Sequence, residues 1–168
     1  IISVENLLSA WRKFLRGKRK RRDVAVFSLN LIGNILALHR ELADKSYRHG
    51  PYMAFKINDP KPRDIHKAEV RDRLLHHAIY RVLYPHFDRK FIFDSYSCRF
   101  DKGTYRAMDR LNQYVRIVSR NHTRTAWVLK CDIRKFFASI DHKILKDILG
   151  RRLDDSDARL PGIVLMRD

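Results

Sequence analysis

Several features that would place this chain in a familiar class are scarce or absent. Its cysteines are Cys98 and Cys131 alone, with no C-x-x-C pair, which argues against a disulfide framework and against a zinc knuckle. No apolar run approaches the roughly 18 residues of a membrane-spanning helix. The first residues, from Ile1 to Glu5, lack the basic and apolar regions of a signal peptide. We therefore expect a soluble protein in a reducing, cytoplasmic compartment.

Negative charge is also scarce. The 168 residues include 36 Lys and Arg against 19 Asp and Glu, a formal net charge of +17. This balance disfavours an acidic binding module and predicts a polyanionic partner. Hydrophobic residues make up 45% and aromatic residues 11%, so the chain is not a disordered basic tail. The length suits one core of ordinary size, and the absence of an initiator Met leads us to expect that the sequence starts inside a longer protein.

The positive charge is densest between Arg12 and Arg22, where eight of eleven residues are basic. Such a run is either a solvated surface arm or a phosphate-binding element. Aromatic residues on both sides, among them Trp11 and Phe27, predict an arm that is anchored to the core. The candidate nucleic-acid-binding residues in this run are Arg16, Lys18, Arg19, Lys20, Arg21 and Arg22.

Hydrophobic periodicity predicts a helix followed by a hairpin. Apolar residues recur at spacings of 4, 4, 3 and 4 from Phe27 to Leu42, which indicates the core face of one amphipathic helix. Apolar residues alternate with others over 53–57, which predicts a strand with one buried face. Residues 58–62 are rich in turn formers, and 63–65 can start the returning strand. Lys61 and Arg63 then lie at or just past the hairpin tip.

Two more helices are predicted between the hairpin and the apolar run over 126–133. One begins near Ala68 and should end before Pro85, because the residue preceding a proline is pushed out of helical geometry. The other should begin with Thr104 as its N-cap and present an apolar face that runs from Ala107 to Val118.

A short apolar run over 126–133 is typical of a buried strand, and it ends on Asp132. A buried carboxylate at that place is costly unless it is paired or bound to a metal. The alternative is that Asp132 caps the following turn. Further on, Asp141 should cap a helix over 142–149 that Gly150 stops.

Four ordered segments resemble reverse transcriptases. Residues 128–142, V-L-K-C-D-I-R-K-F-F-A-S-I-D-H, resemble the first catalytic motif of that family. Residues 55–65 with 71–79 resemble the fingers hairpin and the helix after it. Residues 94–107, D-S-Y-S-C-R-F-D-K-G-T-Y-R-A, resemble the next motif, and the basic start resembles the N-terminal extension of bacterial members. The third segment is closer to enzymes of diversity-generating retroelements than to the S-x-G-F-R-P-G-R-S of group II intron enzymes.

The resemblance implies a role for each matched residue. Asp132 would be a catalytic ligand of two Mg²⁺ ions, with the backbone carbonyl of Ile133 completing part of the metal shell. Lys61 and Arg63 would reach the triphosphate of a dNTP. Phe137 would be the aromatic gate that excludes a ribose 2′-hydroxyl.

The same resemblance places Ser95, Tyr96 and Arg99 along the template. For several residues a structural alternative stays open. Lys61 and Arg63 could be solvated turn charges, and Phe137 could be a core ring, which is the better interpretation for its neighbour Phe136. Arg99 could be a structural ion-pair partner. Asp154 and Asp155 lack the Y-x that precedes the paired aspartates of the family and are not expected to be metal ligands.

The implied fold is α/β, of the α+β kind: reverse-transcriptase fingers plus part of a ferredoxin-like palm, in a right-hand polymerase fold truncated before the Y-x-D-D hairpin. We assign 1–50 to a basic extension and helix, 51–122 to the fingers, 123–150 to the start of the palm and 151–168 to an irregular tail. Because the sequence lacks the later palm carboxylates, we expect no polymerisation by these 168 residues alone.

The function predicted from these segments is that of the N-terminal fragment of an RNA-directed DNA polymerase, a nucleotidyltransferase. Its expected partners are an RNA template, a DNA or RNA primer and a dNTP, with a small accessory protein as a further candidate and no membrane. A diversity-generating retroelement is the expected setting. The alternatives are a group II intron maturase, a phage-defence reverse transcriptase, or a non-catalytic RNA-binding module.

Overall fold

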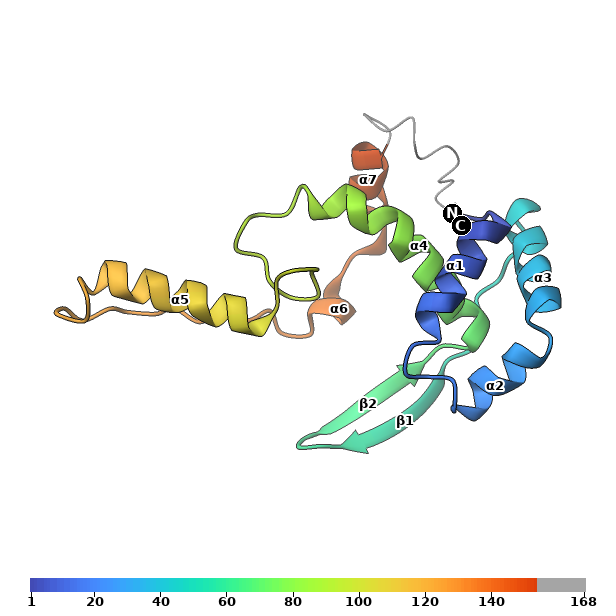
Figure 1. The fold of residues 1–168 in the computed structure, drawn as a ribbon, viewed down its shortest axis with the longest axis horizontal. Coiled ribbons are helices and arrows are strands. Elements are labelled where there is room, and N and C mark those ends of the chain that lie inside the picture. The colour runs from blue at the N-terminus through green and yellow to red at the C-terminus, as the bar shows by residue number, and fades with distance from the viewer. Residues whose placement is uncertain (154–168) are drawn as a thin grey trace. The chain divides into compact units, whose positions relative to one another are not determined.

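A computed structural model of the chain describes residues 1–153, which form helices and one two-stranded antiparallel sheet (Figure 1). The mixed α+β class expected from the sequence is confirmed at this coarse level. The chain divides into two compact units, and we call residues 1–85 the N-terminal unit and residues 86–153 the C-terminal unit. The elements are α1 (Val4–Phe14), α2 (Arg22–Leu29), α3 (Leu31–Ala43), β1 (Met53–Asn58), β2 (Pro62–Lys67), α4 (Val70–Asp88), α5 (Thr104–Val118), α6 (Phe136–Ser139) and α7 (His142–Leu153).

The hydrophobic core lies in the N-terminal unit, between α1, α3 and the first half of α4. Phe14, Ile35 and Leu74 are among its fully buried side chains. Trp11 packs against two phenylalanine rings, with centroid separations of 5.4 Å to Phe14 and 5.1 Å to Phe27. The aromatic anchors predicted on both sides of the basic run are therefore confirmed.

The single helix predicted over 27–42 is wrong in one respect, because it consists of α2 and α3 with a break at Asn30. The backbone of Asn30 leaves helical geometry, with φ −124° and ψ 48°. The side chain of Asn34 donates a 2.9 Å hydrogen bond to the carbonyl of Phe27, which occupies one of the last acceptors of α2. The predicted core face holds across the break: Ile35 and Leu38 are buried, and Phe27 packs against the core.

The hairpin is confirmed, with Phe55 opposite Ile65 and Ile57 opposite Arg63. The prediction that β1 buries one face is wrong, because all six of its residues are exposed. Figure 1 shows the two strands extending away from the helices of the N-terminal unit, so the apolar side chains that alternate along β1 gain no covering layer there.

Two predicted helix boundaries differ from the structure. Helix α4 does not end before Pro85 but runs on to Asp88. A proline in the last turn removes one backbone donor, which the remaining helical hydrogen bonds outweigh. The N-cap of α5 is Gly103 rather than Thr104, since the backbone of Gly103 has φ +99°, a conformation that glycine adopts without strain.

The segment 126–133 is not a buried strand. None of its residues is in a strand, and Trp127 and Leu129 are 92% and 87% exposed. A strand forms only where a neighbour takes up its backbone hydrogen bonds, and none of the segments within residues 1–153 pairs with this one.

The end of the described chain confirms one prediction and corrects another. Asp141 caps α7 as predicted, because its Oδ1 accepts hydrogen bonds from the backbone N–H groups of Lys143 (2.8 Å) and Ile144 (3.1 Å). Gly150 does not stop that helix, which continues to Leu153 at a propensity cost of about 1 kcal/mol. Residues 151–153, predicted to be irregular, are thus helical, while Asp154, Asp155 and the rest of the tail lie outside the described residues.

None of the helices within residues 1–153 combines the length and the apolar character needed to cross a bilayer.

Candidate nucleic-acid interface

Residues 16–22, here called the basic loop, comprise the connection from α1 to α2 and the first residue of α2. Gly17 turns the chain just after α1 with φ +68°, and no atom lies within 4 Å of where its Cβ would be. Lys18 is half-buried: its Nζ donates a 3.2 Å hydrogen bond to the carbonyl of Phe14 and lies 5.2 Å from the centroid of that ring. Across residues 1–153, no side-chain partner neutralises the other cations of the loop, which are exposed: Arg16, Arg19, Lys20, Arg21 and Arg22. A polyanion is therefore the natural counter-charge for this loop.

Asp23 ties the end of the basic loop to the hairpin. Its Oδ2 accepts hydrogen bonds from Lys67 Nζ, at the end of β2, and from Arg73, at the start of α4, both at 2.6 Å. Partial burial by itself would raise the pKa of Asp23, but the hydrogen bonds from Lys67 and Arg73 outweigh it and lower the pKa below its ordinary value. One carboxylate thus fixes the loop, the second strand and α4 to one another.

A second carboxylate, Asp72, fixes the approach to the first strand. Its side chain is fully buried and accepts hydrogen bonds from the hydroxyl of Tyr47 (2.7 Å) and the backbone N–H of Gly50 (3.1 Å). Burial and the bond to Asp72 raise the pKa of Tyr47 above its ordinary value. A Cβ at Gly50 would lie 2.9 Å from Glu69 Cδ, so a larger residue there would displace the end of the Glu69 side chain.

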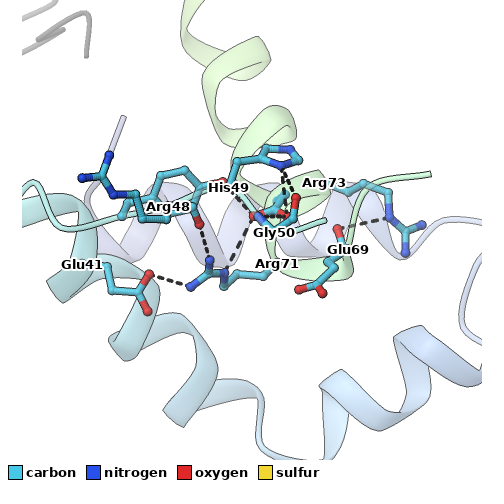
Figure 2. Close-up of polar contacts among 9 residues, drawn as sticks. Glu41, Arg48, His49, Gly50, Glu69, Arg71 and Arg73 are labelled. Carbon is cyan, nitrogen blue, oxygen red and sulfur yellow. Dashed lines mark hydrogen bonds and ion pairs between the residues drawn. The ribbon is translucent and has the colours of Figure 1, made fainter. Parts of the chain in front are cut away.

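Arg71 extends this network toward α3 (Figure 2). Its guanidinium donates to Glu41 Oε2 and to the carbonyl of Arg48, both at 2.6 Å, and lies 5.1 Å from the centroid of the Tyr47 ring. The linker that leads into β1 is therefore held from both sides. Together with Asp23, these contacts fix both strands of the hairpin at their base.

At the other end of the hairpin, Lys61 and Arg63 are exposed. Neither side chain makes a polar contact with another described residue. The hairpin thus presents two cations at a distance from the core, on strands whose bases are fixed. Both interpretations of these residues, triphosphate contact and solvated turn charge, are compatible with this position.

In the C-terminal unit, Arg99 forms a structural ion pair, which is one of the two roles that the sequence left open. Its Nε donates to Asp88 Oδ1 (2.7 Å), and its remaining nitrogens donate to the carbonyls of Asp88, Ile92 and Ser95. The guanidinium also lies 5.4 Å from the centroid of Phe91. Arg99 therefore closes the loop that follows α4.

Tyr96 and Ser95 are half-buried in the same loop. The hydroxyl of Tyr96 donates to Asp94 Oδ1 (2.9 Å), and Asp94 also accepts from the hydroxyl of Tyr114 (2.9 Å) and from Arg110 (3.1 Å). The hydrogen bonds from Tyr96 and Tyr114, and then that from Arg110, lower the pKa of Asp94. The loop is thus held onto α5 by polar contacts.

The predicted catalytic segment is exposed to solvent. Asp132 is exposed, so the expectation of a buried carboxylate is wrong. Ile133 is 64% exposed, Phe137 84% and Phe136 48%, which makes the core-ring interpretation of Phe136 wrong as well. Among residues 1–153 the 126–133 segment has no strand partner, so no described layer covers these side chains.

Metal binding stays a prediction. Within residues 1–153, no three His, Cys, Asp or Glu side chains gather in a group that could hold a metal ion. Asp132 and the carbonyl of Ile133 would therefore need further ligands to hold Mg²⁺, and the described residues alone do not fit a two-ion site.

The sequence interpretation missed Asp23, Tyr47 and Asp72. A signal for Asp72 was present, because it lies three residues before the buried Leu75, on the same face of α4. An acidic residue at a core-facing position predicts a buried, hydrogen-bonded carboxylate. Nothing comparable marked Tyr47 or Asp23, whose partners are 25 and 50 residues away along the chain.

Comparisons with known proteins leave the family open. No family model matches the chain. A curated relative, Protein YkfC of Escherichia coli (strain K12), is 24% identical over 123 residues, which is 71% of this chain and 31% of that protein. The chain therefore spans about a third of the relative's length, and the relative's name states no activity.

Proposed function

We propose that the chain is the template- and nucleotide-binding portion of an RNA-directed DNA polymerase. The observation that carries the proposal is a hairpin fixed at its base by Asp23 and Asp72, with Lys61 and Arg63 exposed at its far end. Placing a charged group accurately requires that its supporting element be rigid. The basic loop, joined to the same hairpin through Asp23, supplies the cations that hold a nucleic-acid backbone.

In this proposal the N-terminal unit corresponds to the basic extension and about the first half of the fingers. The segment from 123 onward corresponds to the start of a ferredoxin-like palm. The support comes from the order of the four sequence segments and from the hairpin followed directly by a helix. Asp132 and Ile133 would contribute to Mg²⁺ binding only when further carboxylates are supplied, and Phe137 would lie beside the sugar of the incoming nucleotide.

Binding of a nucleotide to the chain with its nucleic acid tests the proposal. An RNA template annealed to a DNA primer should bind the chain, and a complementary dNTP should raise its affinity. Arg63→Gln should abolish the effect of the nucleotide while leaving nucleic-acid binding within about twofold, because loss of one exposed charge contact is a small part of the total. Arg116→Gln, which removes an exposed arginine of α5, is the matched control and should behave as the unchanged chain does.

A non-catalytic RNA-binding module is the second candidate. It is favoured by the exposed basic loop, which can hold an RNA backbone without any catalytic site. In that case the RNA would bind with the same affinity whether or not a dNTP is present, and Arg63→Gln would change nothing specific to the nucleotide. That result would overturn the polymerase proposal and leave RNA binding in place.

Among reverse transcriptases, we propose that the chain belongs to the type encoded by diversity-generating retroelements. The support is the sequence of the segment over 94–107. A neighbouring pair of template and variable repeats with a small accessory gene would support it. Intron boundaries around the gene would indicate a group II intron maturase instead. A phage-defence locus would indicate a phage-defence reverse transcriptase.

A further inference from the structure

The N-terminal unit contains a groove that is distinct from the basic loop and from the hairpin tip. It has a volume of about 880 Å³ and lies between α2, the start of β1 and the start of α4. Its apolar lining includes Val26, Phe27, Tyr52 and Met53. A hollow of this size, with a mainly apolar lining and a few polar groups, is typical of sites that take a small ligand or part of a larger one.

Tyr52, at the wall of this groove, is the last ring of a three-ring stack. The ring of His49 lies between those of His76 and Tyr52, with centroid separations of 5.6 Å and 4.8 Å and an interplanar angle of 22° in each pair. Tyr52 is 55% exposed, so part of its ring is open to a fourth partner. The stack and the linker held by Asp72 fix the orientation of this ring before any ligand arrives.

The charge beside the groove indicates what that partner is. The basic loop ends at Arg22, and Val26 of the groove follows one helical turn later on α2. Two carboxylates, Asp23 and Glu69, also line the groove. The charge of Asp23 is matched by Lys67 and Arg73. The cations Lys67 and Arg71 share the lining with Glu69. A polyanion on the loop therefore meets no unpaired negative charge from Asp23 on its way to the apolar lining.

Unpaired RNA fits this combination of surfaces. Proteins bind single strands by holding phosphates on cations and stacking bases on aromatic rings, with about 1–3 kcal/mol for each stacked base. The exposed Asn30 lies at the groove and offers an amide that can both donate to and accept from a base edge.

We propose that Tyr52 is a stacking platform for an unpaired base of a single-stranded RNA whose backbone lies on the basic loop. The inference rests on the proposed function and deepens it, because it assigns the single-stranded part of the template to a particular surface. It does not depend on whether Lys61 and Arg63 at the hairpin tip contact a nucleotide.

The experiment uses the whole 168-residue chain and a short single-stranded RNA that carries 2-aminopurine at one position, stepped along the strand in a series. Stacking on Tyr52 should quench the fluorescence of the probe at one position. Tyr52→Ala should abolish this quenching and weaken binding about tenfold, or ~1.4 kcal/mol, whereas Tyr52→Phe should retain both. The control is Tyr105→Ala, which removes a tyrosine that is 86% exposed and should have no effect.

A second variant leaves the ring in place. Val26 is 62% exposed, so Val26→Glu should not disturb the core, yet it brings a negative charge into the groove and should also abolish the quenching. If no position is quenched, or if Tyr52→Ala binds as tightly as the unchanged chain, the platform is disproved while RNA binding by the loop stands. If the unchanged chain does not bind the RNA at all, the proposed function fails together with this inference.

Discussion

In the N-terminal unit the side chains of α1, α3 and α4 bury one another, whereas α5 in the C-terminal unit has no buried residue. Two phenylalanines illustrate the contrast, since Phe14 is fully buried and Phe137 is 84% exposed. Both units contain amphipathic helices, so the difference does not come from hydrophobic pattern. It comes from whether a second apolar surface is present to cover the first.

The polar contacts of the two units differ in the same way. Asp72 is buried and lies within a packed core, while Asp94 is joined to tyrosine and arginine side chains at the surface. Buried hydrogen bonds are worth more than exposed ones, because water competes for the latter. The N-terminal unit is therefore expected to provide the rigid base for the hairpin, and the experiments below challenge this contrast.

The largest effect should come from the core. Phe14→Ala removes a fully buried ring and should lower the free energy of unfolding by about 3–5 kcal/mol. Phe137→Ala, the matched change at an exposed ring, should stay within about 0.5 kcal/mol of the unchanged chain. Urea denaturation measures both. Similar losses for the two variants would mean that the units are packed alike.

Removal of the buried carboxylate should come next. Asp72→Ala leaves the hydroxyl of Tyr47 and the N–H of Gly50 without their acceptor and should cost about 3 kcal/mol. Hydrogen exchange should also accelerate across the hairpin, because its base is released. Asp109→Ala, at an exposed aspartate of α5, is the control. A loss under about 1 kcal/mol, with unchanged exchange, would contradict the role given to Asp72.

The Arg99 contacts test whether the units respond separately. Arg99→Ala removes hydrogen bonds to Asp88 and to three carbonyls and should cost about 1.5–3 kcal/mol locally. Faster hydrogen exchange should appear over residues 88–99, with the core around Leu74 unaffected. Arg99→Lys cannot reproduce the guanidinium fork and should behave much like alanine. Faster exchange throughout the N-terminal unit would show that the two units unfold together.

A smaller, pH-dependent effect should appear in the N-terminal unit. The pKa of Asp23 is lowered in the folded chain, so its stabilising effect is complete above the ordinary value of 3.8 and is lost as the pH falls through the lower folded value. Burial, followed by neighbouring charges, also lowers the pKa of His76 and His77 from 6.5, which adds a separate loss of stability below that pH.

Unfolding measured across this pH range should therefore show two steps. Asp23→Asn should flatten the acidic step alone, and a double change of His76 and His77 to Gln should flatten the step below pH 6.5. A chain whose stability is constant between neutral pH and the acidic limit would contradict these assignments.

The sequence predicted where helices and the hairpin form more accurately than it predicted which residues are buried. Spacing alone located the core face that includes Ile35 and Leu38, because the periodicity of a helix is a local property. It could not show that β1 and the 126–133 segment lack a covering layer within residues 1–153, since burial depends on what lies opposite. The strand expected to end on Asp132 is the clearest case: its residues favour a strand, but no described partner supplies the hydrogen bonds.

In the candidate site, too, some residues could be predicted from local sequence and others could not. The basic loop and the cations at the hairpin tip could be found from composition and turn residues. The carboxylates that position them could not, apart from the core-facing spacing of Asp72, because Asp23 meets Arg73 across 50 residues of sequence. Arg99 was assigned two roles from its motif, and only its contacts with Asp88 and the neighbouring carbonyls identified the structural one.

The salt dependence of RNA binding tests the central claim most directly, namely that the basic loop holds a nucleic-acid backbone. The quadruple variant replaces Arg19, Lys20, Arg21 and Arg22 by Gln, and the matched control replaces Arg116, Arg120, Arg124 and Lys130. Between about 50 and 200 mM salt, the slope of log K against log salt for single-stranded RNA should become shallower by about three in the loop variant, from ~0.7 for each of four phosphate contacts. The control should change the slope by less than about one. Equal slopes for the unchanged chain and the loop variant would contradict the account.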